Sequence, residues 1–194
     1  MTRSMADKAK IHPTNFDRIP SYAPHHKQTA VHAVIETPAG TRHKYAFEPS
    51  YGIMLLKATL AEGLRWPYDY GFIPQTLADD GDPLDILVLN DEPTFSGCLL
   101  EVRILGAIQL EKNGVENDRI VGCPTPKPGV ALRTDPYEDI DDLPKELLTG
   151  IKRFLVDYSA DEGNTIEPKG VCSRKKAFKL IDDAREAFSK TQPD

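Results

Sequence analysis

Residues 78–89 read Ala78-Asp79-Asp80-Gly81-Asp82-Pro83-Leu84-Asp85-Ile86-Leu87-Val88-Leu89, and four carboxylates within seven residues lead directly into an apolar run. Residues 84–89 are apolar at odd and even positions except at Asp85, which predicts a strand covered on both faces. Asp85 is therefore expected where water is scarce, and an unpaired carboxylate there costs several kcal/mol or stays protonated. The stretch needs a strong compensating positive charge, for which a divalent metal ion is the natural candidate.

A turn at Gly81-Asp82-Pro83 can bring these carboxylates together. Asp80 and Asp82 share one side of an extended chain and Asp85 has the opposite parity, but glycine tolerates unusual backbone angles and proline fixes its own φ. An all-oxygen site suits Mg2+ or Mn2+ rather than zinc. An EF-hand is excluded, because Leu84 and Asp85 take the places of a required oxygen ligand and a required glycine. An ordinary acidic turn beside a strand is the alternative.

The composition excludes several classes of protein. The chain has 194 residues and a formal net charge of -6, which fits one well-filled domain and argues against a nucleic-acid partner, since such partners normally need a basic surface. No apolar run approaches membrane-spanning length, and residues 1–20 lack the apolar stretch of a signal peptide. We therefore expect a cytoplasmic protein without a membrane partner. Cys98, Cys123 and Cys172 form no Cys-x-x-Cys pair, and Cys98 and Cys123, which lie in apolar strand-like runs, are expected to be small core residues.

The chain divides into an irregular, proline-punctuated arm over residues 1–28 and a single domain over residues 29–194. Short β-type runs are predicted at 31–36, 43–47, 53–57, 84–89, 99–110 and 121–123. Because no helix separates them, they predict a small closed β-barrel. Apolar residues at helical spacing then predict two covering helices, one after Pro144 and one after Ser173. Their apolar faces consist of Leu147, Ile151, Phe154, Leu155 and Tyr158, and of Ala177, Leu180, Ile181, Ala184 and Phe188.

A second chemical theme surrounds the acidic stretch. Cations and phenols lie on predicted strands or at their ends, namely Lys44, Lys57, Arg65, Tyr70, Arg119 and Tyr158. Each alone is most simply a surface charge or an amphipathic core tyrosine. Together they complement a polyanion that metal ions also hold, and metal ions with cationic clamps are how phosphoryl transfer is catalysed.

Two motifs carry a family resemblance. Residues 66–74, Trp-Pro-Tyr-Asp-Tyr-Gly-Phe-Ile-Pro, followed by residues 80–85, Asp-Gly-Asp-Pro-Leu-Asp, strongly resemble the soluble, barrel-type inorganic pyrophosphatases (family I). The resemblance extends from about Val31 to Tyr158. It implies a five-stranded, OB-like barrel flanked by two helices, Mg2+-dependent hydrolysis of pyrophosphate to two phosphates, and self-association into dimers or hexamers.

The resemblance also implies roles for individual residues. Asp80, Asp85 and Asp118 resemble direct metal ligands. Asp82 resembles the carboxylate that orients or deprotonates the attacking water, and Glu36 an acidic residue that supports the metal-bound waters. Lys44, Tyr70 and Tyr158 match phosphate-holding positions, with Tyr70 also counted in the catalytic set. Lys57 stands where the family often has arginine, and Arg119 replaces a phosphate-binding lysine, so both belong to the implied substrate site. Glu111 takes the place of another acidic ligand.

Two departures from the family pattern qualify this interpretation. An acidic residue is common where the chain has Ala46, and a lysine usually follows the tyrosine at the position of Ser159; Lys169 or Lys175 could compensate. These departures motivate an alternative, a catalytically weakened metal-binding or regulatory protein with the same fold. A third reading, an oligonucleotide-binding module, predicts a basic aromatic groove, which the acidic stretch opposes.

Overall fold

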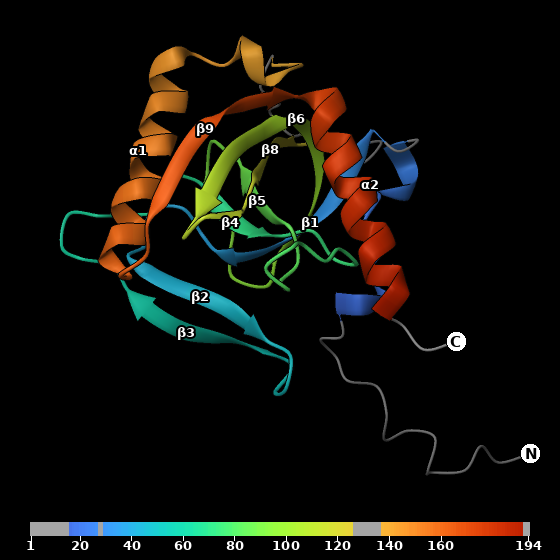
Figure 1. The fold of residues 1–194 in the computed structure, drawn as a ribbon. Coiled ribbons are helices and arrows are strands. Elements are labelled where there is room, and N and C mark those ends of the chain that lie inside the picture. The colour runs from blue at the N-terminus through green and yellow to red at the C-terminus, as the bar shows by residue number, and fades with distance from the viewer. Residues whose placement is uncertain (1–15, 27–28, 126–136, 192–194) are drawn as a thin grey trace, which may run out of the picture.

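The computed structural model describes residues 16–26, 29–125 and 137–191, and Figure 1 shows a ring of strands between two helices. Five strands close the ring in the order β1, β4, β5, β8 and β6, because β6 pairs with β8 on one side and with β1 on the other. Their bounds are Ala30–Thr37 for β1, Asp69–Phe72 for β4, Asp85–Val88 for β5, Arg119–Pro124 for β8 and Leu99–Lys112 for β6. The expectation of a closed, mainly β fold with two helices is confirmed.

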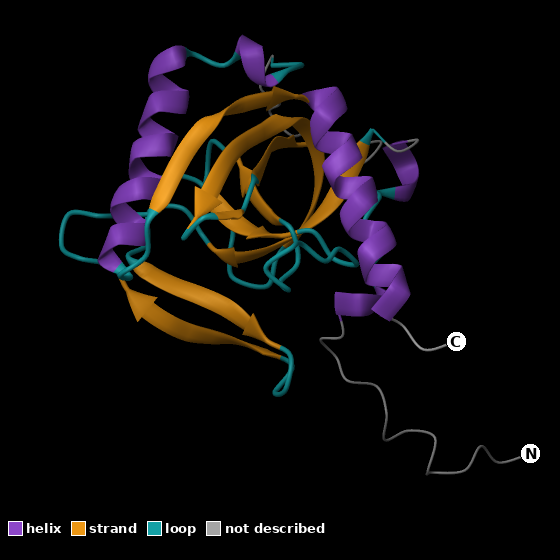
Figure 2. Cartoon of the chain, viewed as in Figure 1, coloured by secondary structure: helices purple, strands orange, loops and turns teal. Residues whose placement is uncertain are grey.

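The remaining strands lie outside the ring. β7 (Val115–Glu116) and β9 (Ile166–Ser173) both pair with the long strand β6. β2 (His43–Glu48) and β3 (Ile53–Thr59) form a separate two-stranded sheet, which projects from the ring in Figure 2. Within the ring all pairings are antiparallel except the parallel pair of β5 with β8.

Strand β5 is covered on both faces, as its unbroken apolar sequence predicts. Leu87 belongs to the core cluster that includes Phe154 and Leu155 of α1 (Lys145–Asp161). Ile86 and Val88 belong to a second cluster that includes residues of α2 (Arg174–Thr191). Alternate side chains of one strand therefore enter two different cores, which fixes the register of β5 against both helices.

The two helices bury the faces that the helical spacing predicts. α1 buries Ile151, Phe154, Leu155 and Tyr158, and it begins directly after Pro144, whose backbone is still extended. α2 buries Ala177, Ile181 and Ala184. Three short 3-10 turns complete the described chain, η2 (Phe16–Arg18), η3 (Pro24–His26) and η4 (Ile140–Asp142). No helix in the described part of the chain is both long and apolar enough to cross a membrane.

Four strands differ from the predictions made from the sequence. The two runs 43–47 and 53–57 do form strands, but as β2 and β3 they stay outside the ring. β4 takes a place in the ring instead, although Asp69 and Gly71 are poor strand formers. Asp69 is fully buried there because its carboxylate accepts hydrogen bonds from Ala39 N, Asn90 Nδ2 and Thr94 Oγ1 at 2.7–2.8 Å.

β9 also went unpredicted, since it contains Pro168 and Gly170. Both residues are tolerated because β9 pairs only with β6 among the described strands and its register shifts near these residues. The three cysteines are free thiols; Cys123 and Cys172 are buried and Cys98 is partly buried, as expected of core residues.

Candidate active site

The acidic loop between β4 and β5 is held in a fixed turn. Gly81 has φ +90°, a left-handed conformation that favours glycine, and its N–H donates to Ala78 O at 3.0 Å. Ala78 N in turn donates to Asp82 O at 2.8 Å. Leu84 N donates to the buried Thr76 hydroxyl at 2.9 Å, which fixes the entry into β5. The turn predicted at Gly81-Asp82-Pro83 is therefore present.

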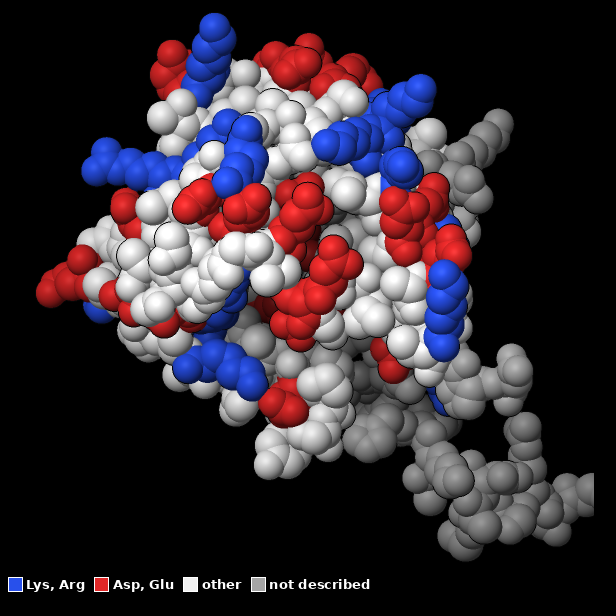
Figure 3. Space-filling view, viewed as in Figure 1, with Lys and Arg blue, Asp and Glu red and all other residues white. Residues whose placement is uncertain are grey.

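This loop forms one wall of a cavity of about 720 Å³, which we call the main cavity. Nine of the predicted site residues line it, namely Glu36, Lys44, Lys57, Tyr70, Asp80, Asp82, Asp85, Arg119 and Tyr158. Ala46, Lys112 and part of η2 also line it. Figure 3 shows acidic side chains gathered over the ring with lysine and arginine side chains around them.

Asp85 is paired within the chain. Its Oδ2 lies 2.8 Å from Nη1 of Arg119, whose side chain is only 6% exposed, whereas that of Asp85 is 25% exposed. Arg119 also donates through Nη1 to the Asn117 carbonyl at 2.9 Å and through Nη2 to the Asn117 side chain. The compensating charge that the sequence argument assigned to a metal ion is thus supplied in part by a buried guanidinium.

The carboxylates that face the main cavity repel one another. The pKa of Glu36 is raised to about 7, chiefly by burial and also by the negative charges of Asp85 and Asp82, although a hydrogen bond from Phe47 N at 2.7 Å opposes this rise. Burial and the neighbouring charges of Asp80 and Asp85 also raise the pKa of Asp82. Both carboxyl groups are therefore stronger proton acceptors than ordinary carboxylates.

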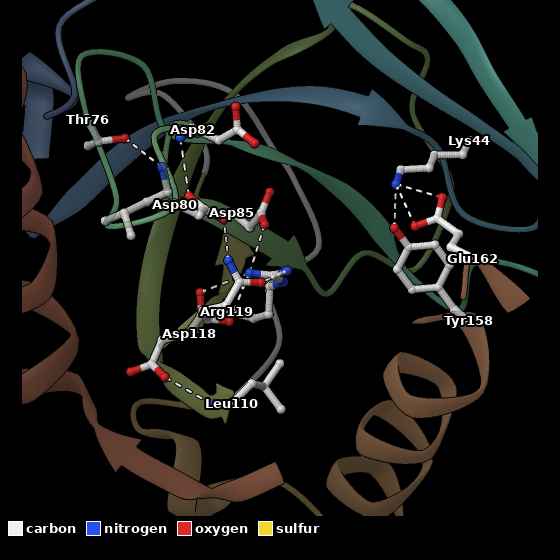
Figure 4. A network of polar contacts seen from close by, with 12 residues as sticks. Lys44, Thr76, Asp80, Asp82, Asp85, Leu110, Asp118, Arg119, Tyr158 and Glu162 are labelled. Atoms are coloured by element: carbon white, nitrogen blue, oxygen red, sulfur yellow. Dashed lines mark hydrogen bonds and ion pairs between the residues drawn. The ribbon is translucent and has the colours of Figure 1, made fainter. Parts of the chain in front are cut away.

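The phenols lie at the cationic end of the cavity. Tyr158 Oη accepts from Lys44 Nζ at 2.5 Å, and Lys44 also donates to Glu162 at 2.8 Å (Figure 4). The rings of Tyr70 and Tyr158 each lie about 5 Å from that of the buried Trp66, centroid to centroid. Burial raises the pKa of both tyrosines, so both remain protonated donors near neutral pH.

Asp118, a predicted metal ligand, does not line the main cavity. Its Oδ1 accepts from Leu110 N at 3.0 Å, and its side chain lines a smaller cavity of about 270 Å³ beside α2. The residue before it takes the inner position: Asn117 is buried, and its Nδ2 donates to Asp80 Oδ2 at 2.5 Å. Figure 4 shows the Asp118 carboxylate directed toward Leu110. Metal binding by Asp118 remains a prediction.

Several other side chains have surroundings that the sequence did not indicate. Glu111 Oε2 pairs with Lys169 at 2.9 Å, so neither residue enters the main cavity. Lys57 lines the cavity but pairs with Glu48 at 3.0 Å. Lys112 also lines the cavity, and its charge lowers the pKa of Asp82 against the larger effect of burial.

Glu162 could have been found from the sequence, because it follows Tyr158 by four residues and therefore shares its helical face. Lys112 gave no such signal, since a charged residue at the end of a long strand is usually solvated.

The main cavity fits a hard divalent cation by its donor chemistry. Asp80, Asp82 and Asp85 supply only oxygen atoms, and burial together with neighbouring carboxylates raises the pKa of Asp82 and Glu36, which a nearby cation would offset. In the described part of the chain no three histidine, cysteine, aspartate or glutamate side chains converge closely enough to ligate one ion.

Comparison with known proteins decides the family. The model of the inorganic pyrophosphatase family matches residues 33–189. The chain belongs to the inorganic pyrophosphatase family. An inorganic pyrophosphatase of Geobacillus stearothermophilus is 37% identical over 153 residues, which cover 79% of this chain and 90% of the relative. One from Haloferax volcanii is 33% identical over 159 residues, covering 81% and 88%.

Solved pyrophosphatase structures share the fold. The inorganic pyrophosphatase of Thermus thermophilus superposes with a TM-score of 0.77 at 32% identity and covers 87% of this chain and 98% of its own. That of Neisseria gonorrhoeae superposes with a TM-score of 0.80 at 27% identity, covering 90% and 99%. The family matched by the motifs at 66–74 and 80–85 is thus confirmed for the domain that carries the site.

Proposed function

We propose that this pyrophosphatase family member hydrolyses inorganic pyrophosphate to two phosphates with the help of Mg2+. The observation that carries the proposal is one cavity lined by both carboxylates and phosphate-binding donors. Asp80, Asp82, Asp85 and Glu36 supply carboxylates, and Lys44, Arg119 and Tyr158 supply donors for phosphate oxygens. A polyanion that brings metal ions fits both sets of groups at once.

Asp80 and Asp85 would hold Mg2+, with Mn2+ as a substitute, because Asp80 lies in the fixed loop, Asp85 begins β5, and both residues line the cavity. When bound, the ion would polarise phosphate oxygens and lower the pKa of a coordinated water. Asp82 would accept the proton of the attacking water, since its raised pKa makes it a competent base. Lys44, Arg119 and Tyr158 would hold the departing phosphate as its negative charge grows.

A weakened, metal-binding protein is the second candidate, and specific contacts favour it. Arg119 already neutralises Asp85, Glu162 already neutralises Lys44, and Ala46 adds no carboxylate to the cavity wall. Each of these two ion pairs must break before a metal ion can bind Asp85 or a phosphate can bind Lys44. This candidate predicts that metal and pyrophosphate bind without turnover.

Phosphate release from pyrophosphate separates the two candidates. We expect release with Mg2+, its loss on chelation by EDTA, and little turnover with Ca2+. Calcium prefers longer bonds and looser coordination, and misplacing the reacting atoms by about 1 Å can cost on the order of a hundredfold in rate. Equal release with and without chelator would refute metal dependence. Binding of pyrophosphate without release would select the second candidate.

A further inference from the structure

The turn η2 lies against the main cavity, although it precedes residues 33–189, which the family model matches. Phe16 and Asp17 both line that cavity. The Phe16 ring makes edge-to-face contacts with Phe47 of β2 at 4.6 Å and with Phe72 of β4 at 5.7 Å between centroids. Phe16 therefore bridges the projecting hairpin and the ring on which the site is built.

Hydrogen bonds to the loop that follows β4 hold η2 and the residues after it in place. Gln75 Nε2 donates to the Asp17 carbonyl at 2.7 Å, and the buried Ser21 hydroxyl donates to the Pro74 carbonyl at 2.7 Å. Gln75 has φ +54°, a left-handed conformation that is unfavourable for a residue with a side chain. Such a conformation persists only where the surroundings impose it, so the loop and η2 form one fixed unit.

The cavity has opposite ends along β2. Lys44 lies near one end of the strand with Tyr158 and Glu162, and Phe47 and Glu48 lie three and four residues further on. That spacing corresponds to roughly 10 to 13 Å of extended chain. Phe16 contacts Phe47 and thus lies at the end away from Lys44.

The end that η2 forms is unfavourable for a further phosphate. The Phe16 ring, packed against Phe47, lines this end of the cavity, and the acidic residue Asp17 lines it beside Phe16. Lys57 belongs to the part of β3 that pairs with Lys44 and Tyr45, and its ammonium is paired with Glu48 at 3.0 Å.

We propose that Phe16 and Asp17 set the length of the phosphate chain that the site accepts. A pyrophosphate held at Lys44, Arg119 and Tyr158 leaves the η2 end unused, whereas a third phosphoryl group would meet Phe16 and the acidic residue Asp17 there. This inference rests on the proposed hydrolysis of pyrophosphate and adds a specificity determinant outside the matched domain.

The test compares the full-length protein with its Asp17→Asn and Phe16→Ala variants on pyrophosphate and on linear tripolyphosphate in Mg2+. Asp17→Asn keeps the side-chain size and the carbonyl that Gln75 binds, so only the charge changes. We expect the ratio of kcat/KM for tripolyphosphate to that for pyrophosphate to rise about three- to tenfold in Asp17→Asn. The ratio should rise further in Phe16→Ala. Phe95→Ala, at a 67% exposed aromatic outside the cavity lining, is the matched control.

An unchanged ratio in Asp17→Asn overturns the inference while leaving the proposed function intact. Thermal unfolding shows whether Phe16→Ala is folded; if it is not, Asp17→Asn decides alone. If the unaltered protein hydrolyses neither compound, the proposed function fails, and calorimetric binding of the two phosphates still tests the inference. The affinity ratio for tripolyphosphate over pyrophosphate should then rise in Asp17→Asn, and an unchanged affinity ratio overturns it.

Discussion

The Nζ atom of Lys44 lies 2.8 Å and 2.9 Å from the two carboxylate oxygens of Glu162. The two side chains are 24% and 20% exposed, so the pair is partly shielded from solvent at the wall of the main cavity. Glu162 therefore competes directly with a phosphate group for the same ammonium.

Glu162→Gln should tighten pyrophosphate binding, because the amide holds Lys44 less strongly than the carboxylate does. We expect the dissociation constant to fall about three- to tenfold, a size that reflects the partial exposure of the pair. Titration calorimetry in the presence of Ca2+ would measure it. Glu146→Gln, an exposed residue in the first turn of the same helix, is the control. Weaker binding in Glu162→Gln would show that Glu162 instead orients Lys44 for its substrate.

Asp85→Asn should lower turnover by about a hundredfold or more, because it removes a ligand charge from the proposed metal site. It should also destabilise the protein by about 2 kcal/mol, since the buried Arg119 loses its carboxylate partner. Phosphate release and urea denaturation measure the two effects separately. Asp79→Asn, an exposed neighbour that does not line the main cavity, should change neither. Full activity of Asp85→Asn would remove Asp85 from the metal site.

The stability of the metal-free protein should fall as the pH rises from about 4.5 to about 7. In this window folded Glu36, with a pKa of about 7, keeps a proton that the unfolded chain has released at its ordinary value of 4.5. The folded state therefore binds more protons, and the free energy of unfolding decreases with pH by up to about 3 kcal/mol. Urea denaturation across the window should show a shallower decrease in Glu36→Gln. Parallel curves for the two proteins would contradict the assigned pKa.

Gly71→Ala should destabilise the protein by about 2 kcal/mol or more. A Cβ atom at Gly71 would lie 1.9 Å from the carbonyl oxygen of Val34 on β1, so the two ring strands would have to separate. Gly150→Ala is the matched control: its Cβ would meet nothing within 4 Å, and alanine favours helix α1 by up to about 1 kcal/mol. The midpoint of thermal unfolding should fall in Gly71→Ala and stay or rise in Gly150→Ala.

The sequence predicted the parts of this fold that follow from local patterns. The unbroken apolar run 84–89 and the helical spacing of Ile151, Phe154, Leu155 and Tyr158 correspond to β5 and α1. β4 and β9 could not be predicted this way. The sequences of both strands are unfavourable for strand formation. In β4, pairing with ring strands and the buried hydrogen bonds of Asp69 outweigh this low strand propensity, and in β9 pairing with β6 does so.

The same distinction holds for the site. The acidic motif and the family resemblance located nine residues that line one cavity. The motif and the resemblance did not indicate the ion pairs that these residues form with other side chains in the folded chain. The Asp85–Arg119 pair and the Lys44–Glu162 pair join residues far apart in sequence, which no local pattern reports. The placement of Phe16 depends on a hydrogen bond from Gln75, again across a long stretch of chain.

Closure of the ring has a kinetic consequence. On one side of β1, Val34 pairs with Phe72 of β4, and on the other side it pairs with Leu99 of β6. The ring therefore closes only when segments that are distant in the sequence meet. Pairings between distant segments form slowly, because the entropy of loop closure is lost before the contacts stabilise them. Helices α1 and α2 can acquire helical structure earlier than this. During refolding, catalytic activity should therefore return later than the helical circular dichroism signal, at the moment when β1 joins both of its neighbours.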